Sequence, residues 1–279
     1  MSPAQFPTAK AMLSMGQDNS PVGMARRQLK IFLAAVMFLT RLPVGRFHEF
    51  REEDVALSTI YFPVVGALIG LAGGLVLLTS SMVPPVMAVL ISMLITICLT
   101  GGLHEDGLAD SADGLIGGQD PQRRLEIMKD SRIGAYGALA LWFSLTAKLF
   151  LVQSLLAVNL VMAVEAMVIA HCLGRTATVA LLTYLPYARI EYSKSGSFGN
   201  KVTFRQLVPV LVFAVILSFL LLGLQGVFCL TAGIVVTLVC GLYFKDKIGG
   251  ITGDCLGAAN QLVELSAYLS LLTLQPAKG

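Results

Sequence analysis

Long uncharged stretches dominate the pattern of apolar and polar residues along the chain. Residues 55–103 and 206–244 contain no Asp, Glu, Lys or Arg. A membrane-spanning helix needs about 20 predominantly apolar residues, so each stretch can hold two spans joined by a tight turn. Turn-forming residues occur where those turns are needed, at 80–85 (SSMVPP) and at 223–226 (GLQG). The pattern therefore predicts two membrane-crossing helical hairpins.

A third apolar region, residues 134–185, is interrupted only by Lys148, Glu165 and Arg175. It is long enough for another pair of spans that turn near Asn159. The three regions together predict six membrane-spanning helices, at residues 57–80, 85–103, 135–156, 160–184, 207–224 and 227–244.

The two ends of the chain carry weaker signals. Residues 256–274 are apolar but contain several polar side chains, so they form either a seventh span that lines the protein interior or an interfacial helix. Residues 28–42 are apolar, short and preceded by basic residues, which favours an interfacial N-terminal helix. We expect residues 1–27 to be a mobile lead-in and residues 28–279 to form one integral-membrane domain. The predicted fold class is all-α, a polytopic membrane helix bundle.

Composition and charge agree with lipid as the solvent for much of the surface. Apolar residues make up 56% of the chain and charged residues 13%, about half the soluble average of roughly 25%. These values exclude a disordered chain, a coiled coil and a typical soluble enzyme. The net charge of +3 is too small to suggest nucleic-acid binding.

Nearly all charges fall in four segments, residues 1–54, 104–133, 186–206 and 245–254. Lys and Arg accumulate in cytoplasmic loops, so these segments and the N-terminus are expected in the cytoplasm. The first 25 residues lack the apolar core of a secretory signal.

One of these segments carries the candidate chemistry. Residues 101–115 read GGLHEDGLADSADGL and place Glu105, Asp106, Asp110 and Asp113 within nine residues. In a helix, the three aspartates would share one face, where like charges destabilise it unless a cation neutralises them. Clustered carboxylate oxygens suit Mg²⁺, Mn²⁺ or Ca²⁺ better than zinc, and Mg²⁺ usually shares its coordination shell with substrate phosphates.

The alternative interpretation is a solvated acidic loop. Gly107 and Gly114 argue against it because they allow a ligand to approach closely. Basic residues also follow in the same segment, and phosphoryl transfer needs both metal ions and fixed cations. These basic residues are Arg123, Arg124, Lys129 and Arg132.

Other polar residues are placed to contribute. Asp254 lies among glycines just before an apolar segment, where it either caps a helix or takes a metal or phosphate role. His104 adjoins the acidic cluster, as a phosphate contact or a partner for a carboxylate. Arg175, inside a predicted span, is as suited to hold an anionic substrate as to a structural role, whereas Lys148 and Glu165 are expected to be structural, either as an interior ion pair or by snorkelling.

Four motifs resemble those of the cobalamin synthase family, whose activity is adenosylcobinamide-GDP ribazoletransferase. They follow one another in the family's order and span the chain from about residue 29 to 270. The motifs are FLTRLPVG at 38–45, the acidic run at 101–115, RRLEIMKDSRIGAYGALAL at 123–141 and GGITGDCLGAANQLVE at 249–264.

The resemblance implies a Mg²⁺-dependent enzyme of the bacterial cytoplasmic (inner) membrane that completes the nucleotide loop of cobalamin. Such an enzyme joins adenosylcobinamide-GDP to α-ribazole or its 5′-phosphate, releases GMP, and gives adenosylcobalamin or its phosphate. The sequence leaves open which acceptor is used, and whether the chain forms a homo-oligomer or contacts other nucleotide-loop enzymes.

The resemblance also implies roles for individual residues. The predicted metal ligands are Glu105, Asp106, Asp110, Asp113 and Asp130. The predicted catalytic residues are Asp106, Asp110 and Asp113, with Asp113 as the acceptor of the hydroxyl proton. The predicted substrate-binding residues are His104, Lys129, Arg132, Arg175 and Asp254.

Two other functions compete with this one. The acidic run is loosely similar to that of CDP-alcohol phosphotransferases, but Asp110 follows Ala109 where those enzymes have Arg. An ion-coupled transporter is the third hypothesis. It is less favoured because transporters place polar residues near the bilayer midplane, often between inverted repeats.

Overall fold

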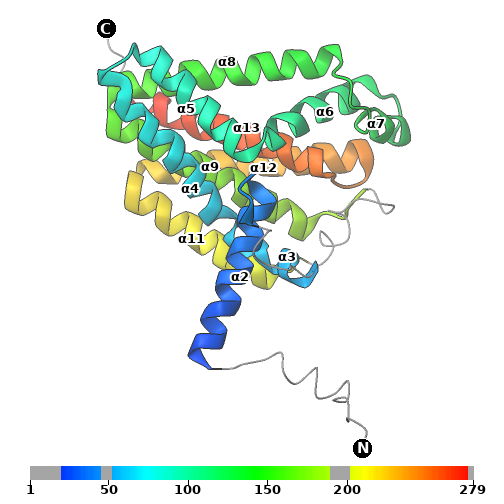
Figure 1. Ribbon diagram of the computed structural model, residues 1–279. Helices are drawn as coiled ribbons and strands as arrows, with labels where there is room; N and C mark the ends of the chain where they lie inside the picture. Colours follow the sequence, from blue (N-terminus) through cyan, green and yellow to red (C-terminus); the bar gives the residue numbers. More distant parts are fainter. Residues whose placement is uncertain (1–19, 45–51, 189–201, 276–279) are drawn as a thin grey trace, which may run out of the picture.

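The structure is a computed structural model and describes residues 20–44, 52–188 and 202–275. Within those ranges the chain is almost wholly helical, and an isolated parallel bridge between Tyr187 and Ile251 is its one strand-like contact (Figure 1). The all-α class is confirmed. The helices are α2 (Pro21–Leu39), α3 (Glu52–Ser58), η2 (Thr59–Tyr61), α4 (Phe62–Val76), η3 (Leu77–Ser81), α5 (Pro85–Thr100), α6 (Leu103–Gly117), α7 (Pro121–Ile127), α8 (Ala135–Val158), α9 (Leu160–Tyr184), α11 (Phe204–Leu222), α12 (Gln225–Ile248) and α13 (Gly253–Thr273).

Five segments are long and apolar enough to cross a membrane, and they match five of the six predicted spans. They are Asp54–Ser81, which runs from α3 through η3, and the helices α8, α9, α11 and α12. The polytopic membrane bundle is thereby confirmed.

The remaining predicted span, 85–103, begins at Pro85 as predicted but ends three residues earlier, at Thr100. Helix α5 has 16 residues and ends at Thr100, so it extends about 24 Å, less than the roughly 30 Å of a hydrocarbon core. Helix α6 continues the path after a bend of 86°, and the two helices together pass the same test as one broken span. The pair is either a broken span or a re-entrant loop, so the acidic segment is a helix that turns sharply away from α5 and not an irregular loop.

Helix α13 passes through the interior of the bundle. Its 21 residues contact α9, α6, α12 and α8, and Asn260, Gln261 and Glu264 are all buried. It runs from the end where α6 and α7 lie towards the opposite end, where the C-terminus is found (Figure 1). Residues 256–274 thus line the protein interior, as the first of the two alternatives expected, although α13 is not among the segments long and apolar enough to count as a span.

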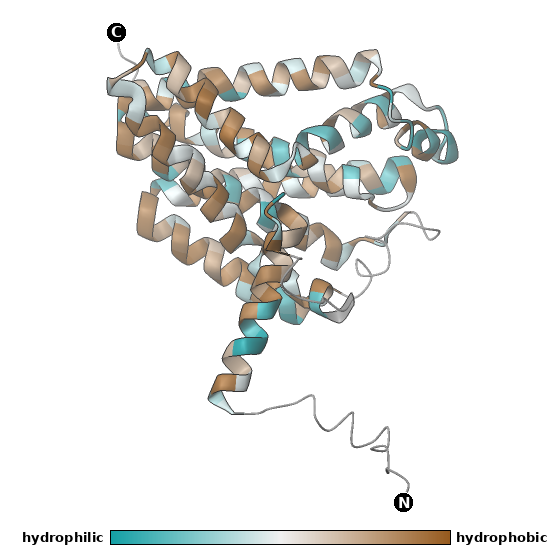
Figure 2. Cartoon of the chain, viewed as in Figure 1, coloured by the Kyte–Doolittle hydropathy of each residue, from teal (hydrophilic) through white to brown (hydrophobic). Residues whose placement is uncertain are grey.

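The lipid-facing surface is made by the outer helices. Large apolar side chains are exposed along α8, α11 and α12, for example Trp142, Phe143 and Leu220. Figure 2 shows these outer faces in brown, whereas hydrophilic residues gather at the end that holds α7 and on part of α2. A surface of this kind fits a multi-pass membrane protein.

Helix α9 is the centre of the packing, because glycines of α4 let the two helices touch. A Cβ on Gly66 would lie 2.4 Å from the carbonyl oxygen of His171, and one on Gly70 would lie 2.3 Å from that of Met167. Small residues four apart commonly make such close helix contacts in membranes. This contact holds α9, with its polar side chains, in the middle of the bundle.

Helix α2 lies across the direction of the long helices and projects beyond them (Figure 1). Its C-terminal half buries Ile31, Ala34, Ala35 and Leu39, whereas its first residues are exposed. It begins at Pro21 and not at residue 28, because Ser20 caps it by accepting a hydrogen bond from Gly23 N. Residues 21–27 of the predicted lead-in are thus helical, and residues 1–19 lie outside the described part of the chain.

Candidate active site

A cavity of about 180 Å³ lies where the N-terminal turns of α6 and α13 meet. We call it the α6–α13 cavity. Polar side chains line one part of it and aromatic and aliphatic side chains the rest. The lining residues are Phe38, Leu39, Phe62, Leu103, His104, Asp106, Gly107, Thr178, Leu182, Tyr187, Gly253, Asp254, Leu256 and Gly257.

Glycines bring α6 and α13 into contact beside this cavity. A Cβ on Gly107 would lie 2.8 Å from the carbonyl oxygen of Asp254, and one on Gly257 would lie 3.2 Å from the Cα of Gly107. Any larger residue would push the helices apart. The contact places Asp106, the neighbour of Gly107, and Asp254 in one cavity although 148 residues separate them in sequence (254 − 106).

The loop before α13 fixes the start of that helix. Gly249 ends α12 with a φ of 74°, and a Cβ on Gly250 would lie 2.3 Å from the carbonyl oxygen of Pro186. Ile251 N then donates to that same oxygen at 3.0 Å. The Thr252 side chain caps α13 by accepting from Cys255 N. The glycines of this motif therefore serve a tight connection that presents Asp254 to the cavity.

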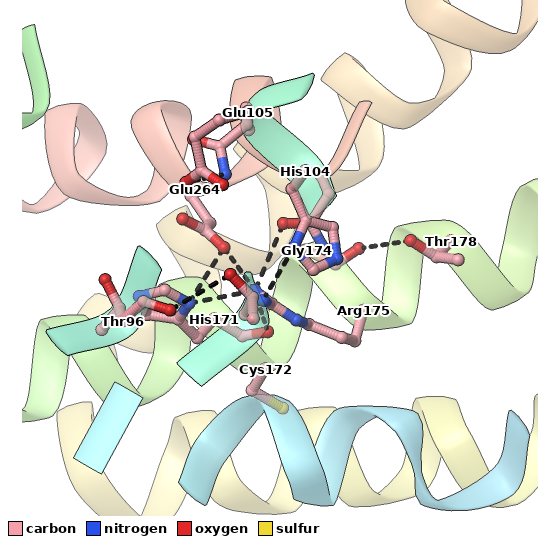
Figure 3. Close-up of polar contacts among 12 residues, drawn as sticks. Thr96, His104, Glu105, His171, Cys172, Gly174, Arg175, Thr178 and Glu264 are labelled. Carbon is pink, nitrogen blue, oxygen red and sulfur yellow. Dashed lines mark hydrogen bonds and ion pairs between the residues drawn. The ribbon is translucent and has the colours of Figure 1, made fainter. Parts of the chain in front are cut away.

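A buried charge cluster is formed by Lys148, His171, Arg175 and Glu264, which come from α8, α9 and α13. Figure 3 shows His171, Arg175 and Glu264 of this cluster together with His104. Lys148 Nζ lies 2.8 Å from Glu264 Oε2, and Arg175 Nη1 is paired with Glu264 Oε1. His171 Nδ1 lies 3.0 Å from the same Oε1. One carboxylate therefore serves two buried cations, which removes much of the penalty of burying them.

Two hydrogen bonds connect α9 and α13, which carry most of this cluster, to α6. Arg175 Nη2 lies 3.3 Å from His104 Nδ1, and Gln261 Nε2 donates to Glu105 Oε1 at 3.1 Å. An arginine can only donate, so Nδ1 of His104 accepts and the neutral ring carries its proton on Nε2. The buried charge cluster thus sets the orientation and the tautomer of a histidine that lines the cavity.

The acidic face of α6 divides in two. Asp106 is exposed in the cavity, and Asp110, one turn further on, is half-buried and does not line it. Asp113 is buried and accepts hydrogen bonds from Gly134 N at 2.7 Å and Gly137 N at 2.8 Å. Asp113 therefore caps the N-terminus of α8, a role that favours a carboxylate.

The predicted basic residues of the 104–133 segment lie away from the cavity lining. Lys129 is exposed, and Arg132, whose side chain is 87% exposed, pairs with Asp130 at 2.7 Å. That hydrogen bond lowers the pKa of Asp130 to about 2. Arg124 is bound to the carbonyl oxygens of Gly118 and Lys247, which ties α7 to the end of α12.

Comparison with known proteins shows to which family the chain belongs. A family model described as cobalamin-5-phosphate synthase matches residues 31–272. The chain belongs to this family. A protein of Shewanella baltica (strain OS195) named adenosylcobinamide-GDP ribazoletransferase is 36% identical over 250 residues, which cover 89% of this chain and 95% of that protein. One of Leptothrix cholodnii with the same name is 39% identical over 252 residues, with 88% and 96% covered. No solved structure matches the chain.

For this member of the cobalamin-5-phosphate synthase family, the structure gathers only part of the predicted site. His104, Asp106 and Asp254 line one cavity. Arg175 does not line it, because its guanidinium is buried against Glu264 and reaches the cavity only through His104. Asp113 holds α8, and the predicted residues of the loop before α8 lie apart from the lining set.

Two intramembrane partners differ from expectation. The predicted Lys148–Glu165 pair is wrong, since Lys148 bonds to Gln261 and Glu264 of α13. Glu165 instead lines an apolar groove between α4, α9 and α11. The importance of Glu264 was missed, although a signal existed: two basic residues inside predicted spans need an acid, and α13 supplies one.

The residues fit Mg²⁺ in part. Among the described residues, no three His, Cys, Asp or Glu side chains lie close enough to hold a metal by themselves. Asp106 and Asp254, however, line one cavity, and Mg²⁺ is usually bound by one or two carboxylates together with substrate phosphates. Glu105, whose side chain accepts a hydrogen bond from Gln261, does not line this cavity. Asp113 and Asp130 do not fit this set.

Proposed function

We propose that this protein joins adenosylcobinamide-GDP to α-ribazole, or to α-ribazole 5′-phosphate, with release of GMP. Family membership and the names of the relatives support this assignment. The observation that carries it is the convergence of Asp106 and Asp254 with the N-terminal turns of α6 and α13 on one cavity. A substrate diphosphate needs such a combination of metal-binding carboxylates and donors for anionic oxygens.

The two helix N-termini would bind the phosphate oxygens. The first backbone N–H groups of a helix have no partner within it and carry a partial positive charge, so they favour anions. His104 would add a side-chain donor from the first turn of α6, because Arg175 leaves its proton on Nε2. These donors are fixed before substrate binds, which is what electrostatic stabilisation of a leaving phosphate requires.

Asp106 and Asp254 would hold Mg²⁺ together with phosphate oxygens. When bound, the ion neutralises charge on the diphosphate and on the departing GMP. A ribazole hydroxyl oxygen forms the new bond to the phosphorus that carries cobinamide, and the bridging oxygen leaves with GMP. We assign the hydroxyl proton to Asp106, which is exposed in the cavity, in place of Asp113, whose oxygens both hold α8.

The apolar part of the cavity suits the flat base of ribazole. Phe38 and Phe62 stack with ring centroids 5.5 Å apart and an interplanar angle of 17°, and Leu182 and Tyr187 complete that wall. Aromatic side chains of this kind bind planar rings by stacking. The cavity is smaller than typical ligand pockets of about 300–1,000 Å³, so it would hold the reacting groups while the corrin stays outside.

We place the protein in the bacterial inner membrane with the cavity end facing the cytoplasm. The basic residues near α7 and at the end of α12 support this orientation. A cysteine at Leu224, between α11 and α12, should react with an impermeant thiol reagent added outside spheroplasts, and one at Gln122 in α7 only after lysis. Cys98 is exposed and would be replaced beforehand. The opposite labelling pattern would reverse the assignment.

The deciding assay uses purified protein in lipid nanodiscs with adenosylcobinamide-GDP, α-ribazole and Mg²⁺. We expect GMP and a cobamide product in equal amounts, and loss of both on chelation with EDTA. Release of CMP from a CDP-alcohol, without GMP, would favour the phosphotransferase alternative. Metal-coupled solute flux in vesicles, with neither nucleotide released, would favour the transporter.

A further inference from the structure

The site described so far has carboxylates and helix N-termini but lacks a cationic side chain that can meet a diphosphate. Lys148 and Arg175 belong to the buried charge cluster, Arg132 pairs with Asp130, and Arg124 binds two carbonyl oxygens. Lys129 is exposed in the loop after α7 and does not line the cavity. None of these five cations is therefore available where the diphosphate would bind.

Arg41, like Lys129, is not itself a lining residue of the α6–α13 cavity, but unlike Lys129 it adjoins lining residues. It follows Phe38 and Leu39, which line the cavity, and its backbone N donates to Leu99 O at 2.8 Å. Its side chain lies against Gly101, two residues before Leu103, another lining residue. Arg41 and Gly101, the two residues in contact, are therefore each within three residues of a residue that lines the cavity.

Gly101 is shaped to accept that side chain. Its φ of 67° suits glycine, and a Cβ there would lie 2.2 Å from Arg41 Nε. Arg41 is exposed, and no ion pair or side-chain hydrogen bond of its own occurs among residues 20–44, 52–188 and 202–275. A guanidinium is thus held against the turn that begins α6, with its charge unneutralised in that part of the chain.

We propose that Arg41 binds the diphosphate of the nucleotide substrate and retains the phosphate of the departing GMP. This inference rests on the proposed function. A guanidinium presents a fork of donors that matches two phosphate oxygens, and the N-terminus of α6 adds partial positive charge on the same side. The FLTRLPVG motif then has a physical reason to accompany the acidic run although 55 residues, 46–100, lie between them.

The test compares Arg41→Gln and Arg41→Lys with Arg27→Gln in nanodiscs. Arg27 is an exposed cation on the projecting part of α2, the helix that precedes Arg41, and it does not line the cavity. For Arg41→Gln we expect the KM for adenosylcobinamide-GDP and the inhibition constant of GMP to rise about tenfold or more, because a charge-assisted contact to phosphate is lost. The KM for α-ribazole should stay within about twofold of the parent value. The KM of Arg41→Lys for adenosylcobinamide-GDP should lie between those of the parent and of Arg41→Gln.

Thermal unfolding of each variant shows that it is folded, which the exposed position of Arg41 favours. An Arg41→Gln enzyme with unchanged GMP inhibition and unchanged KM for the nucleotide substrate would overturn the proposal. An equal rise in the KM for both substrates would also overturn it, because that result indicates a general distortion. If the parent protein releases no GMP at all, the proposed function fails first, and direct binding of GMP to parent and Arg41→Gln still tests Arg41.

Discussion

Asp106 and Asp113 lie seven residues apart in one helix, yet the structure gives them opposite tasks. Asp106 is exposed in the α6–α13 cavity, whereas Asp113 is buried and bonded to two backbone N–H groups of α8. A carboxylate with open coordination positions can take a metal or a proton, and one filled by helix donors holds a structure together. The start of the acidic run thus lines the candidate ligand site, and its end anchors α8.

The same contrast separates the cavity from the buried charge cluster. Cavity residues touch space that a substrate can fill, while Glu264, Arg175 and Lys148 touch one another. Substitutions in the cavity should therefore cost activity with little change in stability, and substitutions in the cluster or at the anchor should cost stability. The four predictions below test this division.

The largest effect on stability is expected from Glu264→Gln. Removing the charge leaves two buried cations without their shared partner, which costs about 3–5 kcal/mol when one member of a buried pair is lost. Unfolding by heat and by denaturant in detergent micelles measures this loss. We expect a strongly lowered transition and a reduced yield of folded protein.

Glu165→Gln is the matched control, because Glu165 is also an intramembrane glutamate but lines an apolar groove. Its replacement should leave stability unchanged or slightly raised, since a polar amide is less costly than a carboxylate there. Equal losses from both substitutions would show that the cluster contributes nothing specific.

Asp106→Asn should have the largest effect on activity with the fold intact. The amide binds a divalent cation poorly and cannot accept the hydroxyl proton, and loss of one such electrostatic group lowers kcat by about 10²–10³-fold. GMP release measures the change, and the unfolding transition should stay close to that of the parent. Substantial activity in this variant would contradict the place of Asp106 in the mechanism.

The charge pattern predicts the membrane part of this fold well, because solvation by lipid acts on each segment separately. The uncharged runs locate α4, α11 and α12 without knowledge of their neighbours. The α5–α6 bend was missed since Gly101 and Gly102 look like any loop, and only the structure shows their positive φ angles and the Arg41 side chain packed against Gly101.

The grouping of site residues could be predicted only where those residues are close in sequence. His104 and Asp106 occupy one turn of α6, so their proximity follows from helix geometry. The partner of Arg175 lies 89 residues away on α13, and the partners of Asp113 are backbone groups that no side-chain pattern reveals. Long-range pairing among buried charges has to be read from the packed helices.

Asp113→Asn should lower stability, but by less than Glu264→Gln does. The amide keeps one acceptor oxygen for two N–H donors and turns its NH₂ group towards the other, so the α8 cap is lost at a cost of about 1–2 kcal/mol. We expect a lowered unfolding transition with kcat reduced only a few fold in the folded fraction. As a control, Asp246→Asn changes an exposed aspartate near the end of α12 and should not move the transition. A loss of activity as large as that of Asp106→Asn, without a change in stability, would return Asp113 to the catalytic set.

Arg132→Gln should have the smallest effect, although the motif makes it an attractive phosphate ligand. Its side chain is 87% exposed and its partner Asp130 lies two residues before it, so this pair forms within one loop and is screened by salt. Steady-state kinetics should show the KM for adenosylcobinamide-GDP within about twofold of the parent, against the tenfold rise expected for Arg41→Gln. Measurement of this KM should therefore show little change for Arg132→Gln and a large rise for Arg41→Gln. A large rise for Arg132 with none for Arg41 would mean that the loop before α8 closes over the cavity when substrate binds, and that the cation of this site comes from that loop and not from the segment after α2.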